Sequence, residues 1–123
     1  NTFDLTSLDE VVGDGNIYST VGDLLIWDQA LRNGKILIPA ILQEAYTPAI
    51  VQEKPKMVYG LGWIINEPGK KVSHSGSWNG FKNNIVRDLQ NGYTLISLSN
   101  GTAGIASYKL LDQFEKALSN LNQ

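Results

Sequence analysis

The residues with the clearest chemical potential stand together in the segment 72–81, which contains the single histidine of the chain. His74 is followed by Ser75, Gly76 and Ser77. An imidazole can exchange protons near neutral pH, and a hydroxyl can donate a hydrogen bond to an anion. A glycine in a strand lets a ligand approach the backbone, and the N–H groups just beyond it can stabilise negative charge. The pattern therefore indicates a binding edge at the end of a strand.

Taken without its neighbours, a single histidine is more often structural or merely exposed than catalytic. A Ser-His-acid triad cannot be recognised among Ser73, Ser75 and Ser77, and the chain has no Gly-x-Ser-x-Gly elbow. The motif by itself thus leaves a catalytic role and a structural role of His74 both open.

Composition excludes several classes of function. The chain has 123 residues, a net charge of −2 and no cysteine. Disulfides and thiolate catalysis are excluded, and one histidine without cysteine makes a zinc site a poor expectation. No basic patch favours nucleic acid, and no apolar run reaches the roughly 20 residues needed to cross a bilayer. We expect one domain over residues 1–123, with no nucleic-acid partner, no membrane segment and no metal.

Glycine-rich segments do not indicate a cofactor. Gly60-Leu61-Gly62 lacks the third glycine and the following helix of a dinucleotide-binding loop, and there is no Gly-Lys-Ser/Thr phosphate loop. We expect no cofactor. The alternation of glycine with large apolar residues instead favours a strand over 58–65 with one bare face, where a neighbouring backbone can approach.

The first half of the chain predicts helices. Ser19-Thr20 followed by Asp23 is a capping pattern, and Asn33-Gly34 is a helix end. Apolar residues at helical spacing lie between them, namely Val21, Leu24, Leu25, Trp27 and Leu31. A short helix is expected over 40–46, with loops over 1–18 and 49–57. Trp27 and Trp63 are expected in the core, whereas Trp78 is expected to be exposed.

The second half predicts a sheet followed by a helix. After the strand at 58–65, strands are expected over 71–76, 81–88 and 93–99, with a hairpin turn at Gln90-Asn91-Gly92. A final amphipathic helix carries an apolar stripe made by Leu110, Leu111, Phe114, Ala117, Leu118 and Leu121. The predicted class is α+β: an antiparallel meander with N-terminal helices and a C-terminal helix packed on the sheet.

Four motifs in this order resemble the C-terminal part of the serine β-lactamase and penicillin-binding protein family. They are the segment 15–24, Tyr59-Gly60-Leu61-Gly62-Trp63, His74-Ser75-Gly76 with Gly80-Phe81, and Leu98-Ser99-Asn100. The likeness covers residues 13–121. It is strongest to the branch of class C β-lactamases, D-Ala-D-Ala carboxypeptidases and related esterases, and implies a partial β-lactamase/transpeptidase-like fold.

The resemblance implies roles for four residues. In the family a Lys/His-Thr/Ser-Gly triplet lines the active site, and His74-Ser75-Gly76 matches it. By this likeness His74 is the catalytic candidate, which tunes protons and charge beside the nucleophile. Ser75 would bind the substrate carboxylate, Gly76 would keep the edge open, and the Ser77 N–H would form half of an oxyanion hole. The implied ligand is a β-lactam or a D-Ala-D-Ala-like peptide, and the implied location is bacterial and extracytoplasmic.

The chain departs from the family pattern in its nucleophile. The family needs a Ser-x-x-Lys element and a Tyr-x-Asn or Ser-x-Asn element, both expected earlier in the polypeptide. No serine here has lysine three residues later, and the chain begins at Asn1. We therefore expect a C-terminal fragment of a larger serine hydrolase, inactive in acyl transfer by itself.

Three further expectations follow from the resemblance and the missing nucleophile. A non-catalytic domain that binds peptidoglycan-like carboxylates, and an esterase on the same scaffold, remain alternatives, because fold does not fix function. A fragment of this kind is also expected to leave a sheet edge uncovered and to form homo-oligomers through it.

Overall fold

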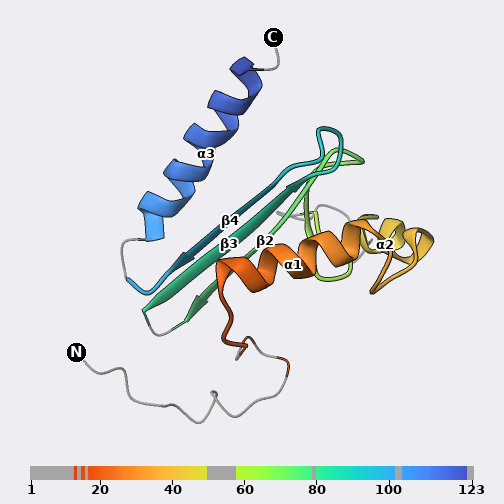
Figure 1. Ribbon diagram of the computed structural model, residues 1–123, viewed down its shortest axis with the longest axis horizontal. Coiled ribbons are helices and arrows are strands. Elements are labelled where there is room, and N and C mark those ends of the chain that lie inside the picture. The colour runs from red at the N-terminus through yellow and green to blue at the C-terminus, as the bar shows by residue number, and fades with distance from the viewer. Residues whose placement is uncertain are drawn as a thin grey trace.

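A four-stranded antiparallel sheet in the order β1-β2-β3-β4 forms the centre of the structure. The computed structural model, shown in Figure 1, describes residues 13, 15, 17–49, 58–78, 80–101 and 104–121. The strands are β1 (Ile64–Glu67), β2 (Lys71–Trp78), β3 (Phe81–Asp88) and β4 (Thr94–Ser99), and the helices are α1 (Val21–Arg32), α2 (Pro39–Ala45) and α3 (Gly104–Leu121). The predicted α+β class and meander are confirmed.

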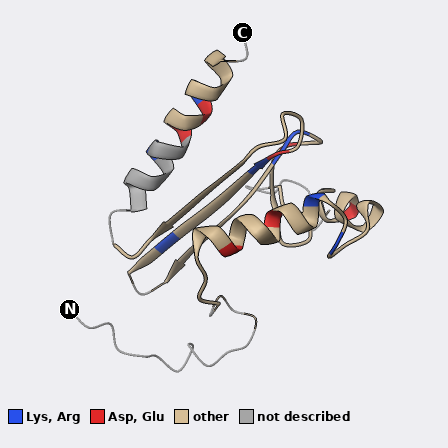
Figure 2. Cartoon of the chain, in the orientation of Figure 1, with Lys and Arg blue, Asp and Glu red and all other residues tan. Residues whose placement is uncertain are grey.

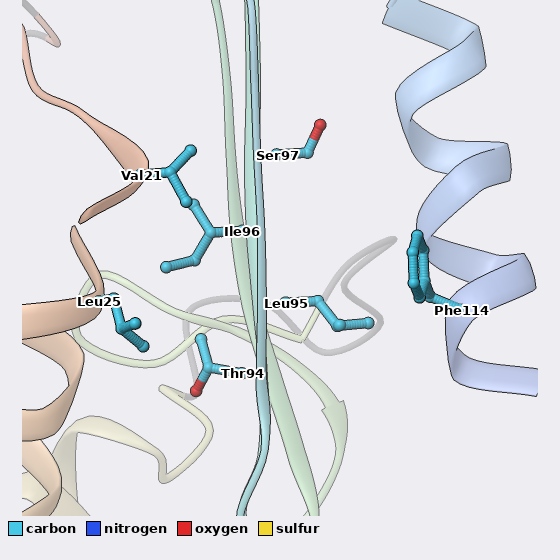
Figure 3. Close-up of a pocket in the computed structure, with 7 residues that line it drawn as sticks. All are labelled: Val21, Leu25, Thr94, Leu95, Ile96, Ser97 and Phe114. Atoms are coloured by element: carbon cyan, nitrogen blue, oxygen red, sulfur yellow. The ribbon is translucent and has the colours of Figure 1, made fainter. Parts of the chain in front are cut away.

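Helices lie on both faces of the sheet. Viewed along the sheet from the β4 edge, α1 lies on one side and α3 on the other (Figure 3). Ile96 and Thr94 point toward α1, whereas Leu95 and Ser97 point toward α3. This alternation follows from the two-residue period of a strand. Paired residues on neighbouring strands share a face, so the alternation along β4 and the register of the pairing together give the face of each side chain in the sheet.

The capping pattern predicted for the first helix is confirmed. The Thr20 hydroxyl accepts a hydrogen bond from the Asp23 N–H at 3.1 Å. Thr20 is thus the N-cap, and α1 begins at Val21, directly after it. At the other end, Asn33 caps the helix and Gly34 takes a positive φ of 67°. That conformation is inexpensive only for glycine, so the chain leaves the helix at the position the sequence indicated.

The strand predicted over 58–65 is largely wrong. The regular strand begins only at Ile64, and Tyr59 forms a single isolated bridge to Ile64. The cause is Gly62, whose φ of 78° turns the backbone between these two residues. The prediction that the glycines admit a neighbouring backbone is confirmed at Gly60, where an added Cβ would overlap the carbonyl oxygen of Ala45.

The core lies between α1, α2 and the first two strands. Its buried members are Leu31, Ala45, Tyr46, Trp63, Ile65 and Val72. Trp63 is buried as expected, but the expectation for Trp27 is wrong, because 39% of its surface is exposed. Trp27 stacks on Trp63 with ring centroids 6.2 Å apart and thus covers the core from outside. Trp78 is exposed, as the sequence indicated.

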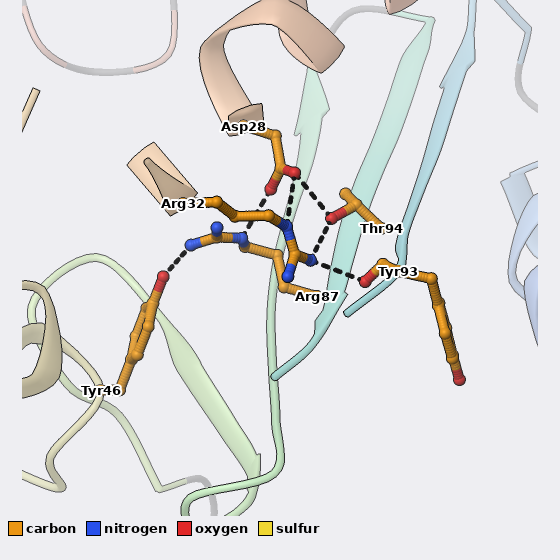
Figure 4. A network of polar contacts seen from close by, with 6 residues as sticks. All are labelled: Asp28, Arg32, Tyr46, Arg87, Tyr93 and Thr94. Atoms are coloured by element: carbon orange, nitrogen blue, oxygen red, sulfur yellow. Dashed lines mark hydrogen bonds and ion pairs between the residues drawn. The ribbon is translucent and has the colours of Figure 1, made fainter. Parts of the chain in front are cut away.

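A buried cluster of charges joins α1 to the sheet (Figure 4). Asp28 on α1 accepts hydrogen bonds from Arg32 Nε and from the Thr94 hydroxyl, each at 2.9 Å. Arg87 Nε on β3 lies 2.6 Å from Asp28 Oδ1 in an ion pair, and Arg87 also donates to the Tyr46 hydroxyl. Asp28 and Arg87 are only 2% and 1% exposed, so each depends on the other for compensation.

The hairpin between β3 and β4 is closed by the carboxylate of Asp88. It accepts hydrogen bonds from the backbone N–H groups of Gln90 and Asn91 and from the Asn91 side chain. Burial alone would raise the pKa of Asp88, but the donors from Asn91, Gln90 and Tyr93 outweigh burial and hold the pKa below its ordinary value. The turn predicted at residues 90–92 is therefore stabilised by a residue just before it.

The C-terminal helix contacts β3 and β4, and a lysine on β2 holds it at one point. Lys71 Nζ lies 3.2 Å from Glu115 Oε2. Burial alone would lower the pKa of Lys71, yet the hydrogen bond and charge of Glu115 outweigh it and raise the pKa. In the predicted apolar stripe, Phe114 is 54% and Leu121 is 81% exposed, while the side chains of Leu110 and Leu111 lie outside the described residues. Much of α3 is thus incompletely covered.

Charged residues lie on the helices and toward the strand ends, which leaves the middle of the sheet uncharged (Figure 2). β4 carries no charged residue at all. No helix in the described part of the chain is long and apolar enough to span a membrane.

Replacing Asp28 tests the buried cluster. We expect Asp28→Ala to lower the free energy of unfolding by about 3–5 kcal/mol, because it leaves the buried Arg87 guanidinium without its counter-charge. Asp23→Ala, which removes an exposed carboxylate from the same helix, should cost less than about 1 kcal/mol. Urea denaturation followed by circular dichroism measures both, and equal effects would contradict this role of Asp28.

The Asp88 turn predicts a pH dependence of stability. A folded-state pKa below the ordinary value gives stabilisation that is present above about pH 3.8 and is lost as the pH falls through the folded pKa. Asp88→Asn should therefore be less stable than the wild type at pH 7, by about 1 kcal/mol. The gap should close in acid. A gap that stays constant from pH 7 to pH 2 in denaturant titrations would refute this assignment.

Candidate functional site

The four residues expected to form a site are consecutive on β2, from His74 in the middle of the strand to Ser77 near its end. His74, Gly76 and Ser77 are exposed and Ser75 is partly exposed, whereas Val72 and Ser73 at the start of the strand are buried. β2 therefore runs out of the core toward solvent. The transition falls at the His74 position, so the core fixes the beginning of the strand and the strand presents the remaining residues.

Pairing with β3 places the imidazole and the hydroxyl on opposite faces of the sheet. His74 pairs with Ile85, which pairs with Ile96, and Ile96 points toward α1. Ser75 lies opposite Asn84, the partner of Ser97, and Ser97 points toward α3. A substrate can therefore contact both groups only by lying across the edge of β2.

That edge is open where the site residues lie. β1 pairs with β2 only through Lys71, Val72 and Ser73. From His74 to Trp78, no strand in the described ranges pairs with the side of β2 that faces away from β3. Apart from Gly76 and its two chain neighbours, no heavy atom of the described residues lies within 4 Å of the position a Cβ would take at Gly76. The exposed N–H and C=O groups of this edge can thus pair with the backbone or carbonyl oxygen of a bound molecule.

His74 has a protein partner that residue spacing does not reveal. Its Nε2 lies 2.9 Å from the Tyr59 hydroxyl, and the two ring centroids are 6.1 Å apart. Fifteen residues separate them in the chain. Tyr59 belongs to one of the motifs that carry the family resemblance, and this membership is the one feature of the sequence that marks Tyr59 as a residue of interest.

A lysine also lies closer to the site than the sequence suggested. Lys82 on β3 is directly opposite Ser77, so their side chains share the face that Ser75 occupies. Asn84 continues this row beside Ser75. One face of the hairpin thus offers two hydroxyls, an amide and a cation, a set suited to an anionic group such as a carboxylate. The register of the hairpin is needed to bring these residues together.

The nucleophile of the family pattern is not found in this sequence, as noted above. The second element needs a correction: Ser77-Trp78-Asn79 matches Ser-x-Asn in its letters, although that element was expected only earlier in the polypeptide. Ser77 and Trp78 belong to β2, and Asn79 lies outside the described residues. The match therefore falls on the same strand as the His-Ser-Gly triplet rather than on a separate element facing it.

A separate groove lies along the free edge of β4. Its volume is about 340 Å³. It is lined by Val21, Leu25, Thr94, Leu95, Ile96, Ser97 and Phe114, which come from α1, β4 and α3 (Figure 3). None of the four candidate site residues contributes to it. Within the described residues, no group of three histidine, cysteine or acidic side chains is placed to hold a metal ion.

Comparison with known proteins now defines the class. The model of the Beta-lactamase family matches residues 2–119, and the chain belongs to this family of serine hydrolase-like proteins. Over 96 residues it is 36% identical to penicillin-binding protein 4* of Bacillus subtilis (strain 168). The alignment covers 76% of this chain but only 21% of that relative, so the chain spans about a fifth of the relative's length. No solved structure matches the chain.

Proposed function

We propose that this chain forms one wall of the active site of a serine hydrolase that acts on β-lactams or D-Ala-D-Ala peptides through an acyl-enzyme. The observation that carries the proposal is the open, glycine-containing edge of β2, which presents His74 and Ser75 in a member of the Beta-lactamase family. The name of the B. subtilis relative, a penicillin-binding protein, supports the substrate class.

Each residue of the wall has a distinct role in the proposed reaction. The Ser77 N–H donates to the carbonyl oxygen of the substrate as negative charge develops there, an interaction worth about 10²–10³ in rate. Ser75, with Lys82 on the same face, holds the substrate carboxylate. His74 exchanges protons beside the nucleophile. The nucleophile itself is proposed to come from polypeptide outside these 123 residues.

A non-catalytic role is the second candidate. A Ser-x-x-Lys element in the polypeptide upstream of this chain would favour the enzyme, and its absence there would favour the binder. In that role the same edge binds peptidoglycan-like carboxylates without turnover. An esterase on this scaffold would use the same wall with a different substrate. Assays of a longer polypeptide that contains this chain, with a β-lactam and a short-chain ester side by side, separate the three candidate functions. Turnover of the β-lactam, turnover of the ester and turnover of neither correspond to the first proposal, the esterase and the non-catalytic role.

Labelling with a fluorescent penicillin tests the proposed function. We expect the 123-residue chain to give no covalent adduct and no nitrocefin hydrolysis. A longer polypeptide with the upstream nucleophile should be labelled, and Ser75→Ala should slow its labelling about tenfold or more, because a hydrogen bond to a charged group is lost.

Ser97→Ala supplies the matched control for that experiment. It removes a hydroxyl from the same face of the sheet, two strands away, and should leave the labelling rate unchanged. A covalent adduct on the isolated chain, detected by mass spectrometry, would contradict the proposal that the nucleophile lies outside these 123 residues. Equal labelling of the Ser75→Ala variant would remove Ser75 from the substrate site.

We also propose that the 123-residue chain associates with itself through the edge of β4. In the described part of the structure no strand covers this edge, and Thr94–Ser99 has no proline or charge to deter pairing. The groove beside it is walled by Val21, Leu25 and Phe114, which are 49%, 44% and 54% exposed. A strand from a second copy would pair with the backbone and bury these side chains.

Adding a charge at this edge tests the self-association. The wild-type chain should show a concentration-dependent sedimentation coefficient, and Ser97→Lys should shift it toward the monomer because the lysine would have to be buried in the groove. Gln90→Lys adds the same charge at the exposed hairpin turn and should behave like the wild type. A wild-type chain that stays monomeric at high concentration would rule out the proposal.

A further inference from the structure

The tyrosine that contacts the candidate catalytic histidine is itself held firmly in place. The Tyr59 carbonyl accepts a hydrogen bond from the Ala49 N–H at 2.7 Å, and Tyr59 forms a bridge with Ile64. Its neighbours are held as well: Gly60 N donates to the Trp63 carbonyl at 2.8 Å, and Leu61 N donates to the Ala45 carbonyl at 3.0 Å. The backbone at Tyr59 is thus tied both to β1 and to the end of α2.

The close approach at Gly60 adds a packing contact to these hydrogen bonds. An added Cβ at Gly60 would overlap the Ala45 carbonyl oxygen, so the segment lies directly against the end of α2. Ala45 and Trp63, to which this segment bonds, belong to the buried core. The phenol ring of Tyr59 therefore projects from a backbone that the core positions, whereas His74 stands on the part of β2 that has left the core.

The hydrogen bond determines which ring nitrogen of His74 can serve a ligand. A neutral imidazole has one nitrogen that donates and one that accepts. Nε2 lies 2.9 Å from the Tyr59 hydroxyl, whichever of the two supplies the proton. No residue in the described ranges contacts Nδ1 by a hydrogen bond, so nothing in that part of the structure competes with a bound molecule for this nitrogen.

We propose that Tyr59 is a positioning residue for His74. Its hydroxyl engages Nε2, holds the imidazole ring in one orientation and leaves Nδ1 facing the substrate or nucleophile. The part that concerns the substrate rests on the proposed function, but the orientation of the ring does not. A partner that engages one ring nitrogen orients a histidine and biases its tautomer, which matters when the ring transfers protons. Here a phenol, rather than a carboxylate, fills that position.

Nitrogen NMR of the imidazole tests the positioning directly. His74 is the only histidine, so the ring signals of the ¹⁵N-labelled chain need no assignment. At about pH 8, where an ordinary imidazole is neutral, the wild type should show one dominant tautomer. Tyr59→Phe keeps the ring and the backbone bonds but removes the hydroxyl. We expect the ratio of the two tautomers to change about threefold, the effect of a weak, exposed hydrogen bond.

Tyr18→Phe is the matched control, because Tyr18 is 82% exposed and its ring contacts Phe81 rather than His74. Its imidazole spectrum should equal that of the wild type. If Tyr59→Phe also leaves the imidazole spectrum unchanged, while backbone amide spectra show that it is folded, the positioning role is overturned.

Kinetics of a longer, active polypeptide separate this inference from the proposed function. If positioning matters to catalysis, Tyr59→Phe should lower kcat with little change in KM and should alter the pH profile of the rate. A changed tautomer ratio with unchanged kinetics, when His74→Ala is impaired, would overturn the catalytic part of the inference. If His74→Ala is fully active as well, the proposed role of His74 fails, while the NMR result still supports the orientation of the ring by Tyr59.

Discussion

The structure depends on one buried carboxylate. Asp28 is the point at which α1, β3 and β4 meet, because it contacts Arg32, Arg87 and Thr94 at the same time. Burial lowers the pKa of Arg87 and the charge of Asp28 opposes that shift, so the attraction between the two ions offsets part of the cost of burying them. Sliding either strand by one residue would turn Arg87 or Thr94 to the other face of the sheet. The charge pair thus selects the register as well as holding the layers together.

The register set in this way reaches the candidate site through β3. Arg87 pairs with Val72, so fixing Arg87 also fixes the buried start of β2. From there the two-residue alternation of the strand determines that His74 faces α1 and that Ser75 faces α3. The positions of the chemical groups are therefore a consequence of packing at the opposite end of the strand. This explains how an exposed histidine can be held in a defined place without being buried itself.

The sequence predicted the elements that depend on local signals. The cap at Thr20, the end at Gly34 and the hairpin after Asp88 were all indicated by residue type and short-range spacing. It failed where a tertiary contact decides the local structure. The segment around Gly60 alternates like a strand, yet its backbone turns at Gly62 because it packs against the end of α2. Amphipathic periodicity also placed Trp27 in the core, although the ring lies over Trp63 from outside.

The candidate site was predictable as a strand segment but not as an arrangement. His74 and Ser75 were found because small residues around a single histidine are unusual, whereas the partners Tyr59 and Lys82 depend on register and on a turn that no local rule encodes. The burial of Asp28 was still harder to predict, since an acidic residue on a helix is ordinarily exposed. Sequence patterns indicate which chemical groups a segment contains, whereas the buried contacts determine which residues those groups lie beside.

In the described part of the structure the sheet leaves two stretches of edge open, one on β2 beyond its pairing with β1 and one on the outer strand β4, and the two stretches differ. The edge of β2 is open beside exposed polar residues and a glycine, and such an edge can admit a small polar ligand without collapsing onto it. The edge of β4 is open between apolar side chains of α1 and α3 and carries no charge. An edge of that kind is prone to pair with another strand. These differences agree with the proposed ligand binding at the β2 edge and the proposed self-association at the β4 edge.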